Sequence, residues 1–268
     1  MKAAMIHFEP VFSHFNQTFG IKKALLHTKK EIKEEKIKIP VYLVPVTEKN
    51  PREKAIEKFS SFLIKEGITH IILSNKAYKN NLIRKKMETT FETFTGTEFV
   101  KYKLYDILRK YAGSKGINLG ISTLIIETDS PEKARQYILK IYKYVKKIII
   151  KSENEAKFSE ITKFFLEEYG LFIPVEQKKS QEENEILIQL DSMVEEKKVL
   201  NISSDINRSS KIIFGSKKKF KNITKYLDLN QMSLEFLIFQ QYNNINEENI
   251  KRFCKDYMIK VSKIVNND

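Results

Sequence analysis

The chain has 268 residues, of which 41% are hydrophobic, and a formal net charge of +14 at pH 7. Its 8 glycines and 6 prolines are too few for long disordered linkers, and its single cysteine, Cys254, excludes an internal disulfide. No apolar run approaches the ~20 residues of a membrane span, and the first residues lack the apolar segment of a signal peptide. We therefore expect a cytoplasmic protein without a membrane-inserted part.

The positive charge is concentrated in the first part of the sequence. Residues 1–115 contain 23 lysines and arginines and 12 acidic residues, a balance of +11, whereas residues 116–268 have a balance of +3. A surplus of this sign attracts phosphates, carboxylates or nucleic acid. It predicts an anionic partner for the first half, although a lysine-rich composition alone also produces it.

The first half alternates predicted strands with predicted helices. Short apolar runs predict three strands, at Lys2–Phe8, Ile39–Val46 and Ile68–Ser74. Apolar residues at helical spacing predict four helices, at Phe15–Glu35, 51–66, Asn80–Glu88 and 97–113. The prolines within Ile39–Val46 favour an edge position for that strand. Thr97 is the expected N-cap of the fourth helix.

The second half is more regular. Six strands are predicted, at Leu119–Glu127, Lys147–Lys151, Leu171–Val175, Glu185–Leu190, Val199–Ser203 and Lys211–Phe214. Five helices are predicted, at Pro131–Val145, Glu153–Tyr169, Phe220–Leu227, Ser233–Tyr242 and Glu247–Val265. Strands joined by crossover helices indicate parallel pairing. The short polar stretch 113–116 predicts a boundary between a basic N-terminal α/β domain, residues 1–115, which ends in a connecting helix, and a second domain, residues 116–268.

This second domain resembles a Rossmann-type domain, and the whole layout resembles the shikimate dehydrogenase and methylene-tetrahydrofolate dehydrogenase group. Residues 96–99 stand where those enzymes open their connecting helix, and residues 146–165 resemble their second strand and helix. The runs 165–175 and 186–191 also resemble an uncharacterised clostridial Rossmann-like family. The resemblance implies two α/β domains, the second a doubly wound parallel sheet with C-terminal helices, and a ligand cleft between them.

The turn after the first strand of the second domain departs from that resemblance. Dinucleotide-binding turns are rich in glycine, whereas Glu127-Thr128-Asp129-Ser130-Pro131 contains none. Asp129 also places a negative charge where a phosphate would lie. We therefore expect no cofactor, with the Asp129 carboxylate capping the helix in place of the anion. The alternative is an NAD(P)-dependent oxidoreductase with a divergent phosphate loop.

Several polar residues are candidates for ligand binding, each with a structural alternative. Asp129 and Ser130 form either a helix cap or an unusual ligand loop, and Ser152 either caps a helix or faces a ribose hydroxyl. Asn75 and Lys76 follow the third strand, at the edge where ligands of open α/β sheets bind. A solvated lysine-rich face explains that segment equally.

The preferred ligand position lies at Thr95, Gly96 and Thr97. If the resemblance holds, these residues open the connecting helix at the mouth of the interdomain cleft, where a helix N-terminus can bind an anion. Simple capping by Thr97 is the alternative. The Asn-Val-Thr-x-Pro-x-Lys signature that supplies the catalytic lysine of shikimate dehydrogenases is absent, so no catalytic residue can be assigned.

Other chemistry has weaker support in the sequence. His7, Glu9 and His14 suggest a metal site, but no spacing fixes a third ligand, so we expect no metal. His70 and Cys254 are expected to be buried core residues. The basic run 217–221 lacks the interleaved aromatic residues of a stacking platform for nucleic acid.

The sequence leads us to expect a binding or regulatory protein for a small anionic ligand, and it leaves assembly into a homo-oligomer open. Whether it catalyses a reaction stays open. The alternatives are the NAD(P)-dependent oxidoreductase and a nucleic-acid-associated basic protein.

Overall fold

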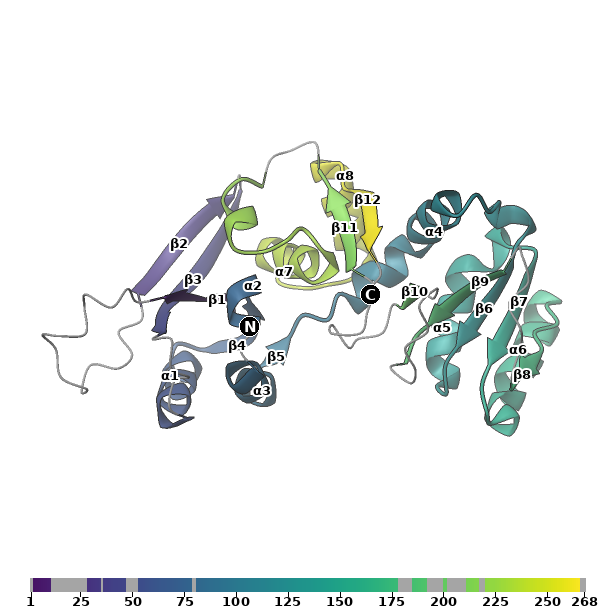
Figure 1. Cartoon of the computed structure of the whole chain (residues 1–268), viewed down its shortest axis with the longest axis horizontal. Coiled ribbons are helices and arrows are strands. Elements are labelled where there is room, and N and C mark those ends of the chain that lie inside the picture. The colour runs from purple at the N-terminus through teal and green to yellow at the C-terminus, as the bar shows by residue number, and fades with distance from the viewer. Residues whose placement is uncertain are drawn as a thin grey trace, which may run out of the picture. The chain divides into compact units, whose positions relative to one another are not determined.

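The structure is a computed structural model that describes residues 2–10, 28–34, 36–46, 53–78, 81–177, 185–191, 200–201, 211–216 and 220–265. It confirms the α/β fold class, because parallel strands alternate with helices in two separate sheets (Figure 1). The chain divides into two compact units. Unit 1 comprises Met1–Phe94 and Ser216–Met258, and unit 2 comprises Thr95–Gly215 and Ile259–Asp268. None of the described helices is long and apolar enough to cross a bilayer.

This division differs from the boundary that the sequence predicted between residues 115 and 116. The connecting helix α4 (Thr97–Ser114) belongs to unit 2. Its Lys101 Nζ donates to Gln136 Oε1 of α5 at 3.0 Å, and Phe99 packs edge-on against Phe214 with ring centroids 5.0 Å apart. The polar stretch 113–116, which comprises the end of α4 and the turn after it, therefore lies within unit 2.

Unit 1 is built on a five-stranded sheet, which we call sheet A, with the strand order β2-β3-β1-β4-β5. Its strands are β1 (Lys2–Pro10), β2 (Thr28–Glu34), β3 (Ile37–Val46), β4 (Ile68–Leu73) and β5 (Glu92–Thr93). All neighbours are parallel except β2, which runs antiparallel to β3. After β1 the chain adds β3 on one side and then β4 on the other. The neighbours β1 and β4 thus form the switch point of this sheet.

Two predictions about sheet A are wrong. Residues 28–34 form β2, where a helix was expected, because they pair along β3 with Ile32 opposite Ile39. The rest of the expected helix, up to residue 27, lies outside the described residues. The strand β3 is not at the edge either, since it lies between β2 and β1. Each proline of β3 has a paired strand on one side only. Pro40 lies opposite Glu31 of β2 but precedes the part of β3 that pairs with β1, and Pro45 lies opposite β1 but follows the part that pairs with β2.

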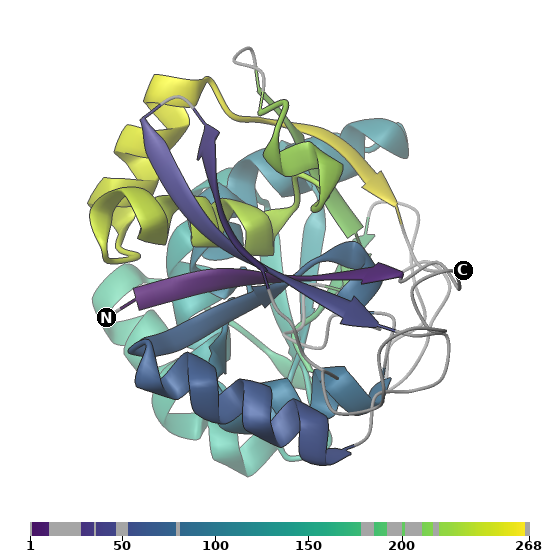
Figure 2. The ribbon, with the colours of Figure 1, turned by 90° about the vertical axis from the view of Figure 1, so that its left-hand side faces the viewer.

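Helices cover both faces of sheet A (Figures 1 and 2). They are α1 (Glu53–Lys65), α2 (Asn75–Tyr78), α3 (Asn81–Thr90) and α7 (Gln231–Tyr242), whereas α8 (Glu247–Tyr257) packs against α7. Alternate residues of β1 face opposite sides. Ala4 and Ile6 belong to the buried cluster that includes Phe59 of α1 and Met87 of α3. On the other side, Gln240 of α7 donates from Nε2 to the carbonyl oxygen of Ala3 at 2.7 Å.

Unit 2 contains a second five-stranded sheet, sheet B, in which all strands are parallel in the order β10-β9-β6-β7-β8. The strands are β6 (Thr123–Glu127), β7 (Lys147–Lys151), β8 (Val175–Glu176), β9 (Glu185–Gln189) and β10 (Leu200–Asn201). Counted from β6, this is the order 5-4-1-2-3 of dinucleotide-binding sheets. Its switch point lies between β6 and β9. The crossover helices α5 (Pro131–Ile141) and α6 (Ser159–Tyr169) pack together, with the Arg135 guanidinium 4.5 Å from the ring centroid of Phe164.

The chain end differs from the prediction. The strand β11 (Lys211–Gly215) does not join sheet B but pairs antiparallel with β12 (Lys260–Val265). Residues 260–265 were expected to continue the last helix, yet α8 ends at Tyr257, where Met258 adopts a left-handed conformation with φ of 51°. The expected helix Phe220–Leu227 contains only a short 3₁₀ turn, Ile223–Lys225.

Candidate functional site

The switch point of sheet B gathers polar residues from three strand ends. Thr128 and Asp129 follow β6, Ser152 follows β7, and Asp191 lies two residues beyond β9. The carboxyl ends of parallel strands meet at one edge of the sheet, and ligands of open α/β sheets bind in that crevice. This edge is therefore the expected position of a ligand site in unit 2.

The Asp191 carboxylate occupies the turn between β6 and α5. Its Oδ2 accepts the backbone N–H of Asp129 at 3.1 Å and the hydroxyl of Thr128, and its Oδ1 pairs with the ammonium of Lys133. A carboxylate from the end of β9 thus takes the contacts that a phosphate would make with the first turn of such a helix. Asp191 was not among the predicted site residues, although it directly follows the predicted strand Glu185–Leu190.

Burial alone would raise the pKa of the Asp191 carboxyl, but the hydrogen bonds from Lys133, Thr128 and the Asp129 amide outweigh burial and hold the pKa below its ordinary value. The Asp191 side chain is 22% exposed and that of Lys133 is 46% exposed. The carboxylate is therefore ionised at neutral pH and keeps a fixed negative charge inside the turn.

The predicted cap of α5 is confirmed for Ser130 but wrong for Asp129. Ser130 is the N-cap, and its Oγ accepts the backbone N–H of Lys133 at 3.3 Å. The Asp129 side chain turns toward the neighbouring strand, where its Oδ1 accepts the hydroxyl of Ser152 at 2.8 Å. The Ser152 Oγ in turn accepts the backbone N–H of Asn154 at 3.2 Å. Asp129 and Ser152, both predicted site residues, therefore bind each other.

Charged residues at the last positions of the strands are also paired. Lys151 Nζ of β7 lies 3.1 Å from Glu127 Oε1 of β6, and Gln189 Nε2 of β9 donates to Glu127 Oε2 at 3.3 Å. The switch point of sheet B thus holds two sets of polar contacts, one around Asp191 and one around Glu127. In the first set the Thr128 hydroxyl and the Asp129 amide donate to the Asp191 carboxylate.

The switch point of sheet A is formed by a histidine and a serine. His7 Nδ1 of β1 lies 2.9 Å from the Oγ of Ser74, which follows β4, and that Oγ accepts the backbone N–H of Ala77 at 3.3 Å. The ring of Tyr226 meets His7 edge-on with centroids 4.8 Å apart, and its carbonyl oxygen accepts the backbone N–H of Asn75 at 3.1 Å. Ser74 is fully buried and His7 is 6% exposed. A substrate would therefore meet the exposed Asn75 rather than the Ser74 hydroxyl.

The predicted residues at the start of α4 belong to unit 2. Gly96, with φ of 80°, is the N-cap without a side-chain capping bond, so the expected cap at Thr97 is wrong. The Thr95 Oγ1 accepts the backbone N–H of Thr97 at 3.4 Å and lies 2.9 Å from the Thr97 hydroxyl. Glu98 brings its own negative charge to the first turn, where it pairs with Lys101. The assignment of these residues to an interdomain cleft stays a prediction.

The remaining candidates are the predicted metal site, the basic run 217–221, His70 and Cys254. Among the described residues, no group of three or more His, Cys, Asp or Glu is placed to hold a metal ion, and His14 lies outside them, as do residues 217–219. His70 is a packed histidine, with its ring stacked on Phe239 at 4.9 Å and its Nε2 2.9 Å from Glu92 Oε2. Cys254 is buried, as expected.

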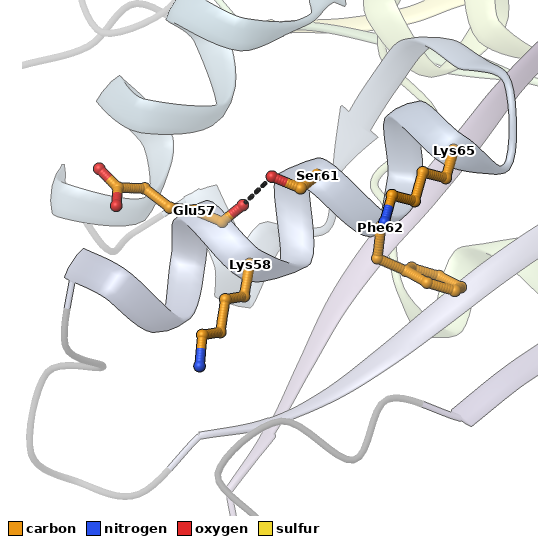
Figure 3. A pocket seen from close by; sticks show the side chains of 5 residues that line it. All are labelled: Glu57, Lys58, Ser61, Phe62 and Lys65. Carbon is orange, nitrogen blue, oxygen red and sulfur yellow. Dashed lines mark hydrogen bonds between the residues drawn. The ribbon is translucent and has the colours of Figure 1, made fainter.

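A shallow hollow along α1 lacks the convergent lining of a binding pocket among the described residues. The described side chains that line it come from that helix: Glu57, Lys58, Ser61, Phe62 and Lys65 (Figure 3). The Ser61 hydroxyl donates to the carbonyl oxygen of Glu57 at 2.9 Å, and the Glu57 carboxylate pairs with Lys86 of α3 at 3.0 Å. Among the described residues, the hollow thus lacks lining groups that converge from a second element, which a binding pocket needs.

No protein-family model matches the chain, and no curated protein matches it. The resemblance to shikimate dehydrogenase therefore stays a prediction, and the assignment of function depends on the geometry of the two switch points.

Proposed function

We propose that this protein binds a small anionic ligand as a binding or regulatory protein and is not a nicotinamide-dependent oxidoreductase. The observation that carries the proposal is the hydrogen bond from the Asp129 backbone N–H to Asp191 Oδ2. In dinucleotide-binding sheets the pyrophosphate lies at the N-terminus of this first crossover helix. Here that place is held by a carboxylate of the chain itself.

Electrostatics decides against a diphosphate at this turn. Two like unit charges about 4 Å apart repel by about 4 kcal/mol at an effective dielectric constant of about 20. A helix N-terminus stabilises an anion by only about 0.3–1 kcal/mol, or by ~2 kcal/mol in partly buried geometries. A pyrophosphate at this turn would meet this repulsion and would find the Asp129 amide already bound, while Lys133, paired with Asp191, offsets part of the negative charge. The side chains of Asp129 and Ser130 also keep ligand atoms from the backbone, which glycine would not do.

The anion fits unit 1 better than unit 2. Over the whole sequence, unit 1 contains 26 lysines and arginines and 15 acidic residues, against 22 and 19 in unit 2. The switch point of sheet A is the general position for a ligand in such a sheet. Asn75 is exposed there, directly after Ser74, and Lys76 is the next residue of α2. We assign the anion to this edge, where Asn75 is exposed and Lys76 supplies the next positive charge in the sequence.

The assignment is tested by thermal unfolding with inorganic phosphate, pyrophosphate and citrate, since a ligand that binds only the folded state raises the melting temperature. We expect one of these anions to stabilise the chain and Lys76→Glu to abolish the shift. Lys58→Glu is the matched control, because Lys58 is exposed on α1 of the same unit. Equal losses in both variants, or no stabilisation by any anion, would contradict the assignment.

The exclusion of a dinucleotide needs its own measurement. Titration with NADH and NADPH, followed by nicotinamide fluorescence, is expected to show no saturable binding. Micromolar binding of either cofactor would overturn the proposal and support the oxidoreductase.

A further inference from the structure

A second surface of unit 2 combines exposed tyrosine rings with exposed cations. It lies at the amino-terminal edge of sheet B, opposite the switch point, because the Lys146 backbone N–H donates to the carbonyl oxygen of Ser122 just before β6. We call it the tyrosine surface and define it by Tyr105, Arg109 and Lys110 of α4, by Lys143, Tyr144 and Lys146 between α5 and β7, and by Lys147 at the start of β7.

Two tyrosines form the centre of the tyrosine surface. The rings of Tyr105 and Tyr144 lie with centroids 4.2 Å apart at an interplanar angle of 34°. Tyr144 is 46% exposed, so part of its ring is open to solvent. The Arg109 guanidinium lies 5.9 Å from the centroid of Tyr105, one helical turn along α4. An aromatic ring held in place and open to solvent offers a face on which a planar group can stack.

Cations outnumber acids around these rings, where the adjacent acid in the sequence is Asp106, next to Tyr105. No aspartate or glutamate occurs at 107–126 or at 133–152, and the second segment contains seven lysines and arginines. Arg109, Lys110, Lys143, Lys146 and Lys147 are all exposed. None of the five forms an ion pair with a described residue, and the preceding acid on α4, Asp106, pairs with Lys103 at 2.9 Å. The tyrosine surface therefore keeps a local excess of positive charge.

We propose that the tyrosine surface binds single-stranded nucleic acid. Proteins that bind single strands without sequence preference combine a cationic track for the phosphates with aromatic rings on which bases stack. The basic run 217–221 contains one aromatic residue, Phe220, which is buried and offers no open ring, whereas the tyrosine surface has both features. A purely electrostatic partner, such as an anionic lipid surface, would use the cations and leave the tyrosine pair without a role. This proposal is independent of the small-anion ligand assigned to unit 1.

Fluorescence anisotropy with a labelled 12-nucleotide oligothymidylate tests the proposal on the full chain. Tyr144→Ala is expected to weaken binding at least about fivefold, the loss of one stacked base, whereas Tyr144→Phe keeps the affinity within about twofold. The double variant Lys143→Ala/Lys146→Ala is expected to lower the slope of log affinity against log salt by about 1.4, since each phosphate contact contributes about 0.7 for single strands. The matched control Lys58→Ala/Lys65→Ala removes two exposed lysines of α1 and is expected to leave the slope unchanged.

Several outcomes would overturn the proposal. They are absence of oligonucleotide binding at low salt, unchanged affinity in Tyr144→Ala, or equally tight binding of a duplex of the same length, which cannot splay its bases onto tyrosine. Co-sedimentation with phosphatidylserine vesicles in the absence of oligonucleotide binding would identify a membrane surface instead. Thermal melting of each variant by circular dichroism establishes that it is folded.

Discussion

The backbone N–H of Asp129 donates to Asp191 Oδ2 at 3.1 Å, which connects the turn after β6 to the end of β9. These two strands are the neighbours at which the strand order of sheet B reverses. The bond therefore lies at the edge where a doubly wound sheet would bind its ligand. It also gives Asp191 a structural role that removal of the carboxylate reveals.

Replacement of Asp191 by alanine is expected to lower the free energy of unfolding by about 1–3 kcal/mol at neutral pH. The Asp129 amide and the Thr128 hydroxyl lose their acceptor, and unmatched polar groups in a partly buried turn cost about this much. Chemical denaturation measures the difference. The control Glu168→Gln removes an exposed carboxylate of α6 and is expected to change stability by less than about 0.5 kcal/mol.

The same loss is expected to depend on pH. Folding lowers the pKa of Asp191 below its ordinary value of 3.8, so the ionised carboxyl stabilises the fold above that pH. The contribution disappears as the pH falls through the lower pKa of the folded state. The stability difference between the wild type and Asp191→Asn is thus larger at pH ~7 than at pH ~3. An equal difference at both values would show that the charge of Asp191 does not stabilise the turn.

An external anion is expected to restore part of the stability of Asp191→Ala. Its first helical turn and Lys133 keep the positive character that the carboxylate neutralises. Sulfate is therefore expected to raise the melting temperature of Asp191→Ala more than that of the wild type. Because sulfate stabilises folded proteins in general, Glu168→Gln gives the reference shift. If sulfate shifts all three proteins equally, Asp191 does not occupy an anion position.

The sequence predicted a polar turn between β6 and α5, but it did not predict that Asp191 would bind there. The apolar run before Glu127 and the proline at 131 indicate a strand, a turn and a helix, and the absence of glycine indicates a changed turn. The partner, Asp191, lies 62 residues from Asp129. Only the strand order brings these two residues together, and a local pattern carries no information on which strand ends become neighbours.

The predicted helix cap at Ser130 is confirmed, whereas the predicted cap at Thr97 is wrong, and the two residues are expected to differ in their effect on stability. Ser130→Ala is expected to cost about 1 kcal/mol, because the Ser130 side chain caps α5. Thr97→Ala is expected to cost less than about 0.5 kcal/mol, because Gly96 is the N-cap of α4 and the Thr97 hydroxyl caps no backbone group of that helix. Urea denaturation of the two variants compares them. A larger loss in Thr97→Ala would restore the cap that the sequence suggested.

Ser74→Ala is expected to destabilise unit 1 by about 1–3 kcal/mol. The fully buried Ser74 hydroxyl contacts both His7 Nδ1 and the Ala77 amide, so its removal leaves buried polar groups unmatched. The chain contains a matched control, since Thr69 Oγ1 lies 2.9 Å from His70 Nδ1 and Thr69 is exposed. Thr69→Ala is expected to cost less than about 0.5 kcal/mol, because water replaces an exposed hydroxyl. Thermal unfolding measures both, and equal losses would contradict a role for burial.

The wrong elements share one cause, which is that tertiary pairing overrides a local pattern. Residues 28–34 are strongly charged, and Ile32 also fits a helical spacing. Their strand conformation depends on pairing with β3. The prolines of β3 are tolerated inside the sheet because β2 and β1 pair with different stretches of β3, so that each proline has a neighbouring strand on one side only. The sequence Ile39–Val46 alone does not show where these neighbours begin and end. Similarly, residues 260–265 become a strand because β11 provides a partner.

Met258→Gly is expected to stabilise the end of unit 1. Met258 follows α8 with φ of 51°, a left-handed conformation that favours glycine, and its side chain is 48% exposed. Relief of this conformation gains about 1–2 kcal/mol, and the added chain entropy of glycine offsets about 0.5–1 kcal/mol of it. Asn243→Gly is the control with φ of 56°, where the gain is smaller because asparagine tolerates this region. Thermal melting that shows Met258→Ala to be as stabilising as Met258→Gly would attribute the effect to the side chain and not to the backbone.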